Sequence, residues 1–278
     1  MNLGSLFRLS AFTTTLNGGN PAGVWIGDTL PDPETMQRIA AEVGFSETAF
    51  VAPASGSDRI VRYYSPEVEV SFCGHATIAT GVVLGENDGE GTYQLATSVG
   101  IVPVTVHQRD GKYEASLTSV EPSYAPAPHA LVIKALSALG WIQDDLDGSI
   151  PPARAYAGAW HLVLAVAEQQ CLAELNYDFE TLKALMLRDS LTTLQLIWRE
   201  SATVFHSRNP FPIGGIVEDP ATGSAAAALG GYLRASELVT VPTTILIRQG
   251  EAIGRPSQIV VHIPVRGGIV VTGQAIHI

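Results

Sequence analysis

Short stretches that alternate between hydrophobic and polar residues make up most of this chain, and they predict strands that are buried on one face. Two stretches depart from this pattern. Residues 72–84 and residues 218–233 are rich in alanine, glycine, serine and threonine, and each follows a strand-like run. A helix with such narrow side chains can be surrounded on all sides, so we predict one small-residue helix in each stretch.

The alternating pattern places strands before and after each small-residue helix. The predicted strands are residues 3–12, 24–26, 45–51, 59–65, 68–72, 92–97, 101–107, 113–117, 153–156, 160–166, 191–199, 203–206, 245–248, 259–263 and 269–272. Further helices are predicted at residues 33–43, 130–139, 168–175 and 179–187. Asp32 is the expected N-cap of the first, which ends at Gly44. Residues 18–23 are expected to form a turn, and residues 122–128, with three prolines, a linker. In each half, a curved sheet wrapped round a central helix fits the pattern better than a βαβ sandwich.

The two small-residue helices resemble each other in sequence. A shift of 149 positions (222 minus 73) aligns them with five identical residues. The aligned pairs are Gly74 with Gly223, Ala76 with Ala225, Ala79 with Ala228, Gly81 with Gly230, and Leu84 with Leu233. This repeat indicates an internal duplication, and we expect two similar halves with both helix N-termini facing one cleft.

The start of each small-residue helix is a candidate anion site. Asp219-Pro220 breaks the preceding extended segment, and Thr222-Gly223-Ser224 then offers two hydroxyls and a bare backbone. Backbone N–H groups in the first turn of a helix, together with the helix dipole, favour negative charge. We therefore expect Gly74, Gly223 and Ser224 to bind an anionic small molecule.

The composition limits the classes of partner. The net charge of −11 argues against nucleic acid or an anionic membrane as a partner. Only 15% of the residues are charged, which indicates large cores and a subunit interface. Two cysteines, Cys73 and Cys171, are too few for a disulfide framework. No signal peptide or membrane span is evident, so we expect a cytoplasmic protein.

Glu47 is the carboxylate best suited to proton transfer. It lies between Phe45 and Phe50 in an expected turn, with no lysine or arginine nearby in sequence. Such surroundings disfavour the ionised form, which suits a group that takes and returns a proton. The alternative interpretation is a solvated loop glutamate, or one that caps a backbone N–H.

His75 and Cys73 lie at the start of the first small-residue helix. His75 is either a second proton carrier, a group that holds the substrate, or a helix-capping histidine. The helix dipole would make the Cys73 thiol reactive, but a buried, inert thiol is an equal alternative.

Other chemistries find little support in the sequence. No cysteine or histidine pair has the spacing of metal ligands, so the sequence gives little support for a metal site. Gly223-Ser224 lacks the G-x-S-x-G elbow of a serine hydrolase. Neither a Walker loop nor a dinucleotide glycine fingerprint is present.

Four motifs, in their order and spacing, resemble the PhzF-like phenazine biosynthesis family over essentially the whole chain. They are Asn-Pro-Ala-Gly at 20–23, Gly-Phe-Ser-Glu-Thr-Ala-Phe at 44–50, Cys-Gly-His-Ala-Thr at 73–77 and Glu-Asp-Pro-Ala-Thr-Gly-Ser-Ala at 218–225. The resemblance implies the α+β diaminopimelate epimerase-like fold, with two pseudo-symmetric domains. Each domain would be a rolled, largely antiparallel sheet around a central helix, with the active site between them. We expect these domains at residues 1–120 with 265–278, so that the last strand returns to the first domain, and at residues 121–264. The resemblance also implies a homodimer.

The resemblance further implies an isomerase that needs no metal or organic cofactor. The characterised chemistry of that family is isomerisation of trans-2,3-dihydro-3-hydroxyanthranilate. The glutamate that matches Glu47 moves a proton between two carbons there, and the residues that match His75, Asp219 and Ser224 hold the substrate and assist. Epimerases and racemases of the wider fold use two cysteines, one at each helix start. Here those positions are Cys73 and Thr222, which excludes the two-thiol mechanism.

Two other hypotheses remain open at this point. In one, Cys73 is the base, with Thr222 opposite, in a dehydratase or epimerase of a cyclic amino acid that resembles the proline racemase-like dehydratases. In the other, the protein is a non-catalytic homologue that keeps the pocket and binds a small molecule. Uptake of solvent deuterium by candidate substrates would separate an enzyme from a binding protein.

Overall fold

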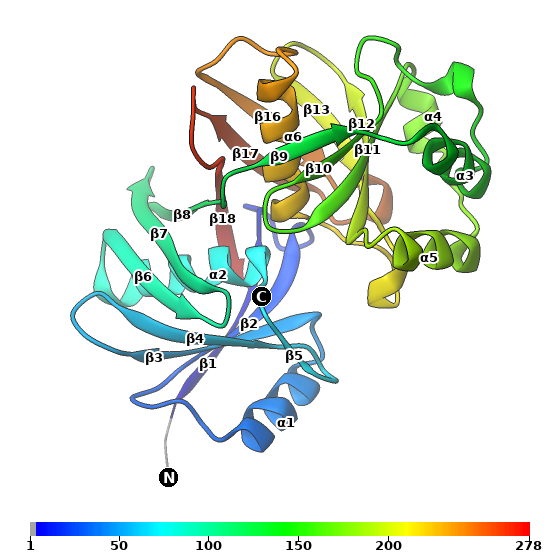
Figure 1. The fold of residues 1–278 in the computed structure, drawn as a ribbon. Coiled ribbons are helices and arrows are strands. Elements are labelled where there is room, and N and C mark those ends of the chain that lie inside the picture. The colour runs from blue at the N-terminus through cyan, green and yellow to red at the C-terminus, as the bar shows by residue number, and fades with distance from the viewer. Residues whose placement is uncertain (1–3) are drawn as a thin grey trace. The chain divides into compact units, whose positions relative to one another are not determined.

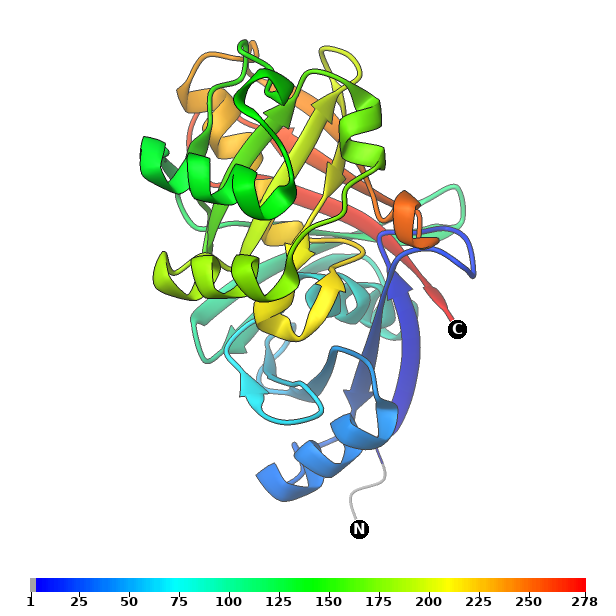
Figure 2. The ribbon, with the colours of Figure 1, turned by 90° about the vertical axis from the view of Figure 1, so that its right-hand side faces the viewer.

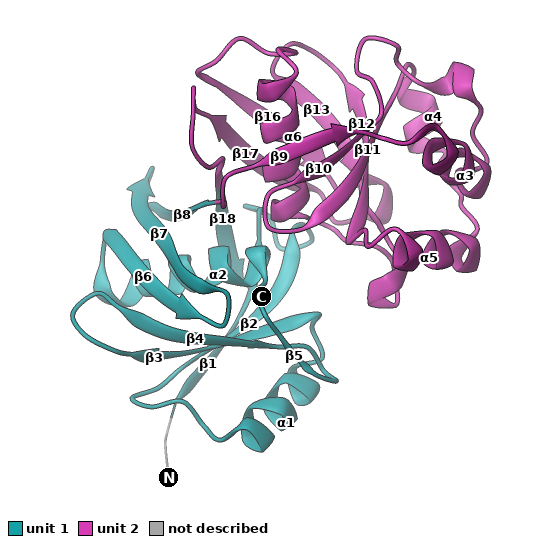
Figure 3. Ribbon diagram, viewed as in Figure 1, with its two compact units in different colours: residues 1–118, 272–278 teal, residues 119–271 magenta. Residues whose placement is uncertain are grey.

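The computed structural model describes residues 4–278, which form two compact units (Figure 3). Unit 1 comprises the residues up to Thr118 together with Thr272–Ile278, and unit 2 comprises Ser119–Val271. Leu3, where the first predicted strand begins, lies outside the described residues. Among residues 4–278, no helix combines the length and the apolar character needed to cross a membrane.

Unit 1 is a rolled sheet around one helix (Figure 1). Its elements, in chain order, are β1 (Ser5–Ala11), β2 (Asn20–Ile26), α1 (Pro33–Val43), β3 (Glu47–Pro53), β4 (Arg59–Tyr64), β5 (Glu69–Val70), α2 (Gly74–Asp88), β6 (Gly91–Thr97), β7 (Gly100–Arg109), β8 (Lys112–Thr118) and the end of β18 (Val270–His277). The strands follow the order β1-β2-β3-β4-β6-β7-β8-β18, and β18 also pairs with β1, which closes the roll. The helix α2 contacts β1, β2, β3, β7 and β8, so it is the central helix of this unit.

Unit 2 repeats this plan around α6 (Gly223–Ala235). Its other elements are β9 (Ser123–Pro126), α3 (His129–Leu139), β10 (Ala153–Tyr156), β11 (Trp160–Val166), α4 (Gln169–Ala173), α5 (Phe179–Arg188), β12 (Thr193–Arg199), β13 (Val204–Arg208), β14 (Pro210–Phe211), β15 (Ile216–Glu218), β16 (Thr243–Gln249) and β17 (Ser257–Ile263). The sheet runs β17-β16-β13-β12-β11-β10-β9, and α6 contacts β9, β10, β11, β12 and β17. In each unit two strand pairs are parallel: β2 with β3 and β4 with β6, then β11 with β12 and β13 with β16. The predicted fold class, a rolled and largely antiparallel sheet around a central helix in each half, is confirmed.

Small side chains let each central helix lie inside its sheet. Ala225, Ala226, Ala227 and Ala228 are each at most 1% exposed, as the small-residue pattern predicts. Residues 75–85 of α2 are likewise all buried. Because the sheet surrounds both helices, neither needs the polar face of an ordinary surface helix.

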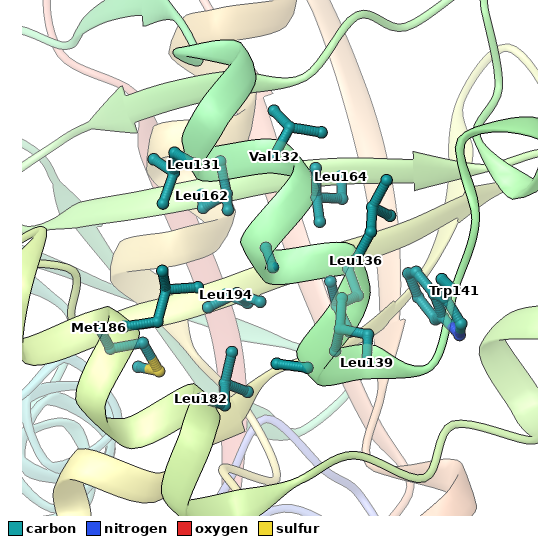
Figure 4. Packing of buried hydrophobic residues seen from close by; sticks show 14 of the residues in the cluster. Leu131, Val132, Leu136, Leu139, Trp141, Leu162, Leu164, Leu182, Met186 and Leu194 are labelled. Atoms are coloured by element: carbon teal, nitrogen blue, oxygen red, sulfur yellow. The ribbon is translucent and has the colours of Figure 1, made fainter.

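A second core lies on the outer face of the unit 2 sheet. The helices α3 and α5 contact each other there, and Figure 2 shows them, in green and yellow-green, along one side of that unit. Figure 4 shows Leu131, Leu136, Leu182 and Met186 of this pair packed over Leu162, Leu164 and Leu194 of β11 and β12. Alternate residues of these two strands therefore face the outer helices, and the residues between them face α6.

Two expected loops are strands in the structure. The expected turn at residues 18–23 ends at Gly19, whose φ is +74°, and Asn20 already begins β2. The expected linker at residues 122–128 contains β9, which pairs antiparallel with β10. It is the last strand of its sheet, where a missing proline N–H interrupts no ladder. The short strands β14 and β15 were not predicted.

Candidate active site

The start of α2 is fixed by a buried hydrogen-bond network. Gly74 is the first helical residue and Cys73 is the N-cap. The Thr77 N–H and the Thr77 hydroxyl both reach the Cys73 carbonyl oxygen, at 3.0 and 2.7 Å. The hydroxyl also lies 2.7 Å from the Tyr63 hydroxyl, and burial raises the pKa of Tyr63 well above its usual value, so Tyr63 stays neutral. These contacts hold the backbone that carries Cys73 and His75.

Glu47, Cys73 and His75 form one cluster, which we call the acid–thiol–imidazole cluster. The Cys73 thiol donates to Glu47 Oε2 at 3.4 Å and lies 3.3 Å from His75 Nδ1. His75 Nε2 lies 3.4 Å from Glu47 Oε2. Cys73 and His75 are buried, whereas the Glu47 side chain keeps 20% of its surface exposed. A carboxylate and an imidazole, which can both carry a proton, thus meet a thiol at the N-terminus of a helix. The partly exposed Glu47 makes this cluster accessible from solvent.

The cluster draws its members from β3 and from the start of α2. Glu47 was expected in the turn that leads into the predicted strand at residues 45–51, and it is the first residue of that strand, β3, where it pairs with Ala22 of the parallel neighbour β2. A strand gives the carboxylate a fixed backbone, which a mobile turn would not. The three ligand atoms of Glu47, Cys73 and His75 lie within 4.8 Å of one another. Sequence spacing could not reveal this group, because Glu47 is 26 residues from Cys73.

Two further residues orient the His75 ring. Asn20 Nδ2 lies 3.2 Å from His75 Nδ1, and Ser46 Oγ lies 3.3 Å from Nε2. Asn20 is buried at the start of β2, and Ser46 directly precedes Glu47. The sequence reasoning did not single out either residue as part of a site, although both lie inside motifs that carried the family resemblance. Their position inside those motifs was the sequence signal that could have identified them as site residues.

The start of α6 has a network of its own in unit 2. Thr222 is the N-cap, which is the position that Cys73 holds at α2. Its hydroxyl donates to Asp219 Oδ2 at 2.6 Å, and its N–H donates to Gln249 Oε1 at 3.2 Å. Gln249 Nε2 donates to the Asp219 carbonyl at 2.7 Å. The Thr222 hydroxyl is therefore committed to a carboxylate. Gln249, at the end of β16, is a further residue that sequence reasoning missed.

A buried ion pair anchors the segment that carries Asp219. Arg208 Nε donates to both oxygens of Glu218, at 3.1 and 3.0 Å, and Arg208 Nη2 also reaches this carboxylate. The Asp219 N–H then donates to the Asn209 carbonyl at 3.0 Å. Gly223 is the first residue of α6 and Ser224 the second. The predicted residues Asp219, Gly223 and Ser224 thus lie close together in sequence, in a segment that these contacts anchor at the start of α6.

Each unit therefore groups its own predicted site residues. Unit 1 groups Glu47, Cys73 and His75 beside Gly74, and unit 2 groups Asp219 with Gly223 and Ser224. The shared cleft that we expect from the duplication stays a prediction, as do the roles of these residues.

Comparison with known proteins assigns the chain to a family. Residues 9–278 match the family PhzC-PhzF, described as phenazine biosynthesis-like protein. The chain belongs to the PhzC-PhzF family. The resemblance read from the four sequence motifs is thereby confirmed.

Proteins similar in sequence to this chain carry isomerase names. The "Uncharacterized isomerase YfhB" of Bacillus subtilis (strain 168) is 28% identical over 288 residues, which cover 100% of this chain and 97% of that protein. The trans-2,3-dihydro-3-hydroxyanthranilate isomerase of Pseudomonas fluorescens is 31% identical over 255 residues, 90% of this chain and 86% of that protein. A crystal structure of the Bacillus anthracis phenazine biosynthesis protein of the PhzF family superposes with a TM-score of 0.87 at 25% identity, covering 100% of this chain and 97% of that one. The names of the Bacillus subtilis and Pseudomonas fluorescens proteins support an isomerase.

Proposed function

We propose that this protein is an isomerase that moves a proton between carbon atoms of a small acidic substrate, with Glu47 as the general acid and base. The observation that carries the proposal is the Glu47 carboxylate held 3.4 Å from His75 at the N-terminus of α2, in a chain whose relatives are named isomerases. The substrate class, an amino acid-like or dihydroaromatic acid, follows the relative that acts on trans-2,3-dihydro-3-hydroxyanthranilate.

In this mechanism Glu47 removes a proton from carbon and returns it to another position. The N–H groups at Gly74, and those at Gly223 and Ser224, stabilise the negative charge that develops on the substrate. His75 and Asp219 orient the amine or hydroxyl of the substrate and can relay the proton. Proton transfer of this kind needs neither a metal nor an organic cofactor, so we propose a cofactor-independent reaction. Cys73 forms part of the pocket wall.

One observation favours a second candidate, in which Cys73 is the base. Its thiol lies 3.3 Å from His75 Nδ1 and 3.4 Å from Glu47 Oε2, so either group could take the thiol proton. The chain would then be a dehydratase or epimerase of a cyclic amino acid. The Thr222 hydroxyl, which already donates to Asp219, would be a weak partner for this chemistry.

Two substitutions separate these candidates. Glu47→Gln keeps the size of the side chain but cannot accept a proton, so we expect a loss of about 10²–10⁴ in rate with ligand binding retained. Cys73→Ser should keep most of the activity. The rate is measured as solvent deuterium exchange into trans-2,3-dihydro-3-hydroxyanthranilate and a panel of cyclic amino acids, and binding as a ligand-induced rise in Tm.

Glu67→Gln is the matched control, because Glu67 is an exposed glutamate of unit 1, outside the cluster. An active Glu47→Gln variant together with an inactive, folded Cys73→Ser variant would assign the base to Cys73. Binding without exchange in the wild-type protein, for every compound in the panel, would favour the non-catalytic binding homologue.

We also propose that the protein is a cytoplasmic homodimer. The low fraction of charged residues, 15%, supports a subunit interface. Sedimentation velocity at micromolar concentration tests the assembly: a mass of about 29.4 kDa, that of one chain, would contradict the dimer.

A further inference from the structure

The two nitrogens of the His75 ring face groups of opposite hydrogen-bonding type. Nδ1 lies 3.2 Å from Asn20 Nδ2, an amide nitrogen that can only donate. Nε2 lies 3.4 Å from Glu47 Oε2, which accepts when the carboxyl group is ionised, and 3.3 Å from the Ser46 hydroxyl, which can also accept. A neutral imidazole carries a proton on one nitrogen and a lone pair on the other. Both sets of contacts are satisfied by a single tautomer, in which the proton is on Nε2 and the lone pair is on Nδ1.

Burial strengthens the influence of Asn20 on this ring. Asn20 is 2% exposed and His75 is 6% exposed, so water has little access to replace their contact. The backbone of Asn20 is held in β2, where it pairs with Ala11 of β1. A proton on Nδ1 would place a ring N–H group against the amide N–H of Asn20, with no acceptor between them. Asn20 therefore selects the tautomer that is protonated on Nε2.

This tautomer also limits what His75 can do for Cys73. The Cys73 sulfur lies 3.3 Å from Nδ1 and 3.8 Å from Nε2, so it is nearer to the nitrogen that Asn20 contacts. Nδ1 has one lone pair in the plane of the ring, and an amide N–H competes for it better than a thiol, which is a weak donor. Nε2 already carries a proton. Glu47 Oε2, at 3.4 Å, is then the acceptor available to the thiol within the cluster.

We propose that Asn20 is a positioning residue that keeps the His75 proton on Nε2, so that the ring donates to Glu47 and does not accept a proton from Cys73. The consequence for the reaction rests on the proposed function. Glu47 is then the proton acceptor of the cluster, and His75 holds its carboxylate by donating to it. Asn20 thereby disfavours the alternative in which Cys73 and His75 form a thiolate–imidazolium pair. The tautomer itself does not depend on the proposed function.

Nitrogen-15 NMR of the full chain, labelled at its seven histidines, measures the tautomer directly. A ring nitrogen without a proton resonates well downfield of a protonated one, and the His75 signals are those missing from the spectrum of His75→Gln. At about pH 8, where an ordinary histidine is neutral, we expect a protonated Nε2 and an unprotonated Nδ1 in the wild-type protein. A proton on Nδ1 in the wild type would overturn the proposal.

Two substitutions show whether Asn20 or Glu47 sets the tautomer. Asn20→Asp replaces the donating amide by an accepting carboxylate of the same size, so Nδ1 should now carry a proton. In Glu47→Gln the new amide can present either oxygen or nitrogen to Nε2, so Asn20 alone should keep the proton on Nε2. An unchanged ring in a folded Asn20→Asp variant, or a proton moved to Nδ1 in Glu47→Gln, would refute the role of Asn20. The wild-type and Glu47→Gln spectra decide the proposal even where Asn20→Asp does not fold.

Asn17→Asp is the matched control, because Asn17 is an exposed asparagine three positions before Asn20. It makes the same change of charge and should leave the His75 signals as they are in the wild type. A changed tautomer in Asn17→Asp would show that added charge, and not the contact with Nδ1, moves the proton.

Deuterium exchange into the substrate panel tests the consequence for the reaction. We expect a folded Asn20→Asp variant to exchange at least about tenfold more slowly than the wild type, because a ring in the wrong tautomer no longer donates to the base. Asn17→Asp should exchange at the wild-type rate. An Asn20→Asp variant with the altered tautomer and full activity would refute the link between the tautomer and the reaction. If no compound exchanges at all, the proposed function fails, and the NMR spectra still decide whether Asn20 sets the tautomer.

Discussion

His161 shows how strongly one buried residue can make the stability of a fold depend on pH. It lies fully buried in β11, with Nδ1 2.8 Å from the Thr193 hydroxyl. Within residues 4–278, its Nε2 has no hydrogen-bond partner. Burial lowers the pKa of His161 to about 3. In the unfolded chain a histidine has a pKa of about 6.5, so between these two values only the unfolded state takes up a proton.

We therefore expect acid to destabilise unit 2 through His161. The free energy of unfolding falls as pH drops below about 6.5, at up to about 1.4 kcal/mol per pH unit, or about 2 kcal/mol between pH 6.5 and pH 5. His161→Asn keeps an amide near the Nδ1 position and should remove this part of the pH dependence. Urea unfolding at pH 7 and pH 5, followed by tryptophan fluorescence, measures it.

The exposed His107 provides the control for this measurement. His107→Asn should keep the full wild-type pH dependence. Equal pH slopes in the wild type and in His161→Asn would show that His161 is not held neutral by burial.

At the scale of single residues, the sequence supplied candidate residues but not their contacts. Glu47, His75 and Asp219 could be chosen because their residue types and local motifs suit proton transfer. The orienting contacts of Asn20 with His75, and of Gln249 with Thr222, join residues 55 and 27 positions apart. Only the fold brings such pairs together, so no local pattern predicts the contact between them.

At the scale of elements, the repeat predicts equivalent glycines in α2 and α6, and the structure gives them different amounts of space. A Cβ atom added at Gly81 would lie 2.6 Å from Ala115 Cβ and 2.9 Å from Val104 Cγ1. One added at Gly230 would lie 3.1 Å from both Ile269 and Val261, a contact that a small shift can relieve. The sheet therefore presses more closely on α2 than on α6 at this position.

Alanine substitutions at these glycines should therefore have different effects. Replacing a helix glycine by alanine stabilises the helix by about 1 kcal/mol, whereas overpacking the core destabilises the protein by about 1–3 kcal/mol. Gly81→Ala should lower stability, whereas Gly230→Ala should be neutral or slightly stabilising, with a difference of about 1–2 kcal/mol between them. Thermal unfolding gives the comparison. The double variant Gly81→Ala with Ala115→Gly should recover part of the loss, and the reverse order of stability would contradict the packing argument.

The ends of an element were predictable where local signals set them, and they were not predictable where strand pairing sets them. Proline at the first helical position and the Asp32 side chain, which accepts from Thr35 N, define α1 as predicted. By contrast β2 and β9 extend into segments whose prolines and glycines indicate loops. Pairing with β1 and β10 overrides that local preference, since each strand gains ladder hydrogen bonds along its neighbour.

At the scale of the whole chain, the first and last strands of the described sequence lie side by side. In unit 1, β18 pairs antiparallel with β1 in the register Leu9 to His277. The Phe12 N–H donates to the Gln274 carbonyl at 2.7 Å, and the Thr272 hydroxyl lies 2.7 Å from the Ser116 hydroxyl of β8. The last seven residues therefore close a sheet whose other strands are all encoded before residue 119.

A chain truncated after Val271 should lose this closure. The edges of β1 and β8 would be left unpaired, and the buried ring of Phe12 would lose Gly273, whose backbone lies against it. We expect amides of β1 to exchange hydrogen for deuterium much faster than in the full chain, measured by mass spectrometry of peptides. His277→Gln in the full chain is the control, because it removes the contact of His277 with Glu86 at 2.8 Å and its ring contact with Phe7 but leaves the backbone ladder in place. Unchanged protection of β1 in the truncated chain would show that unit 1 holds its roll without the returning strand.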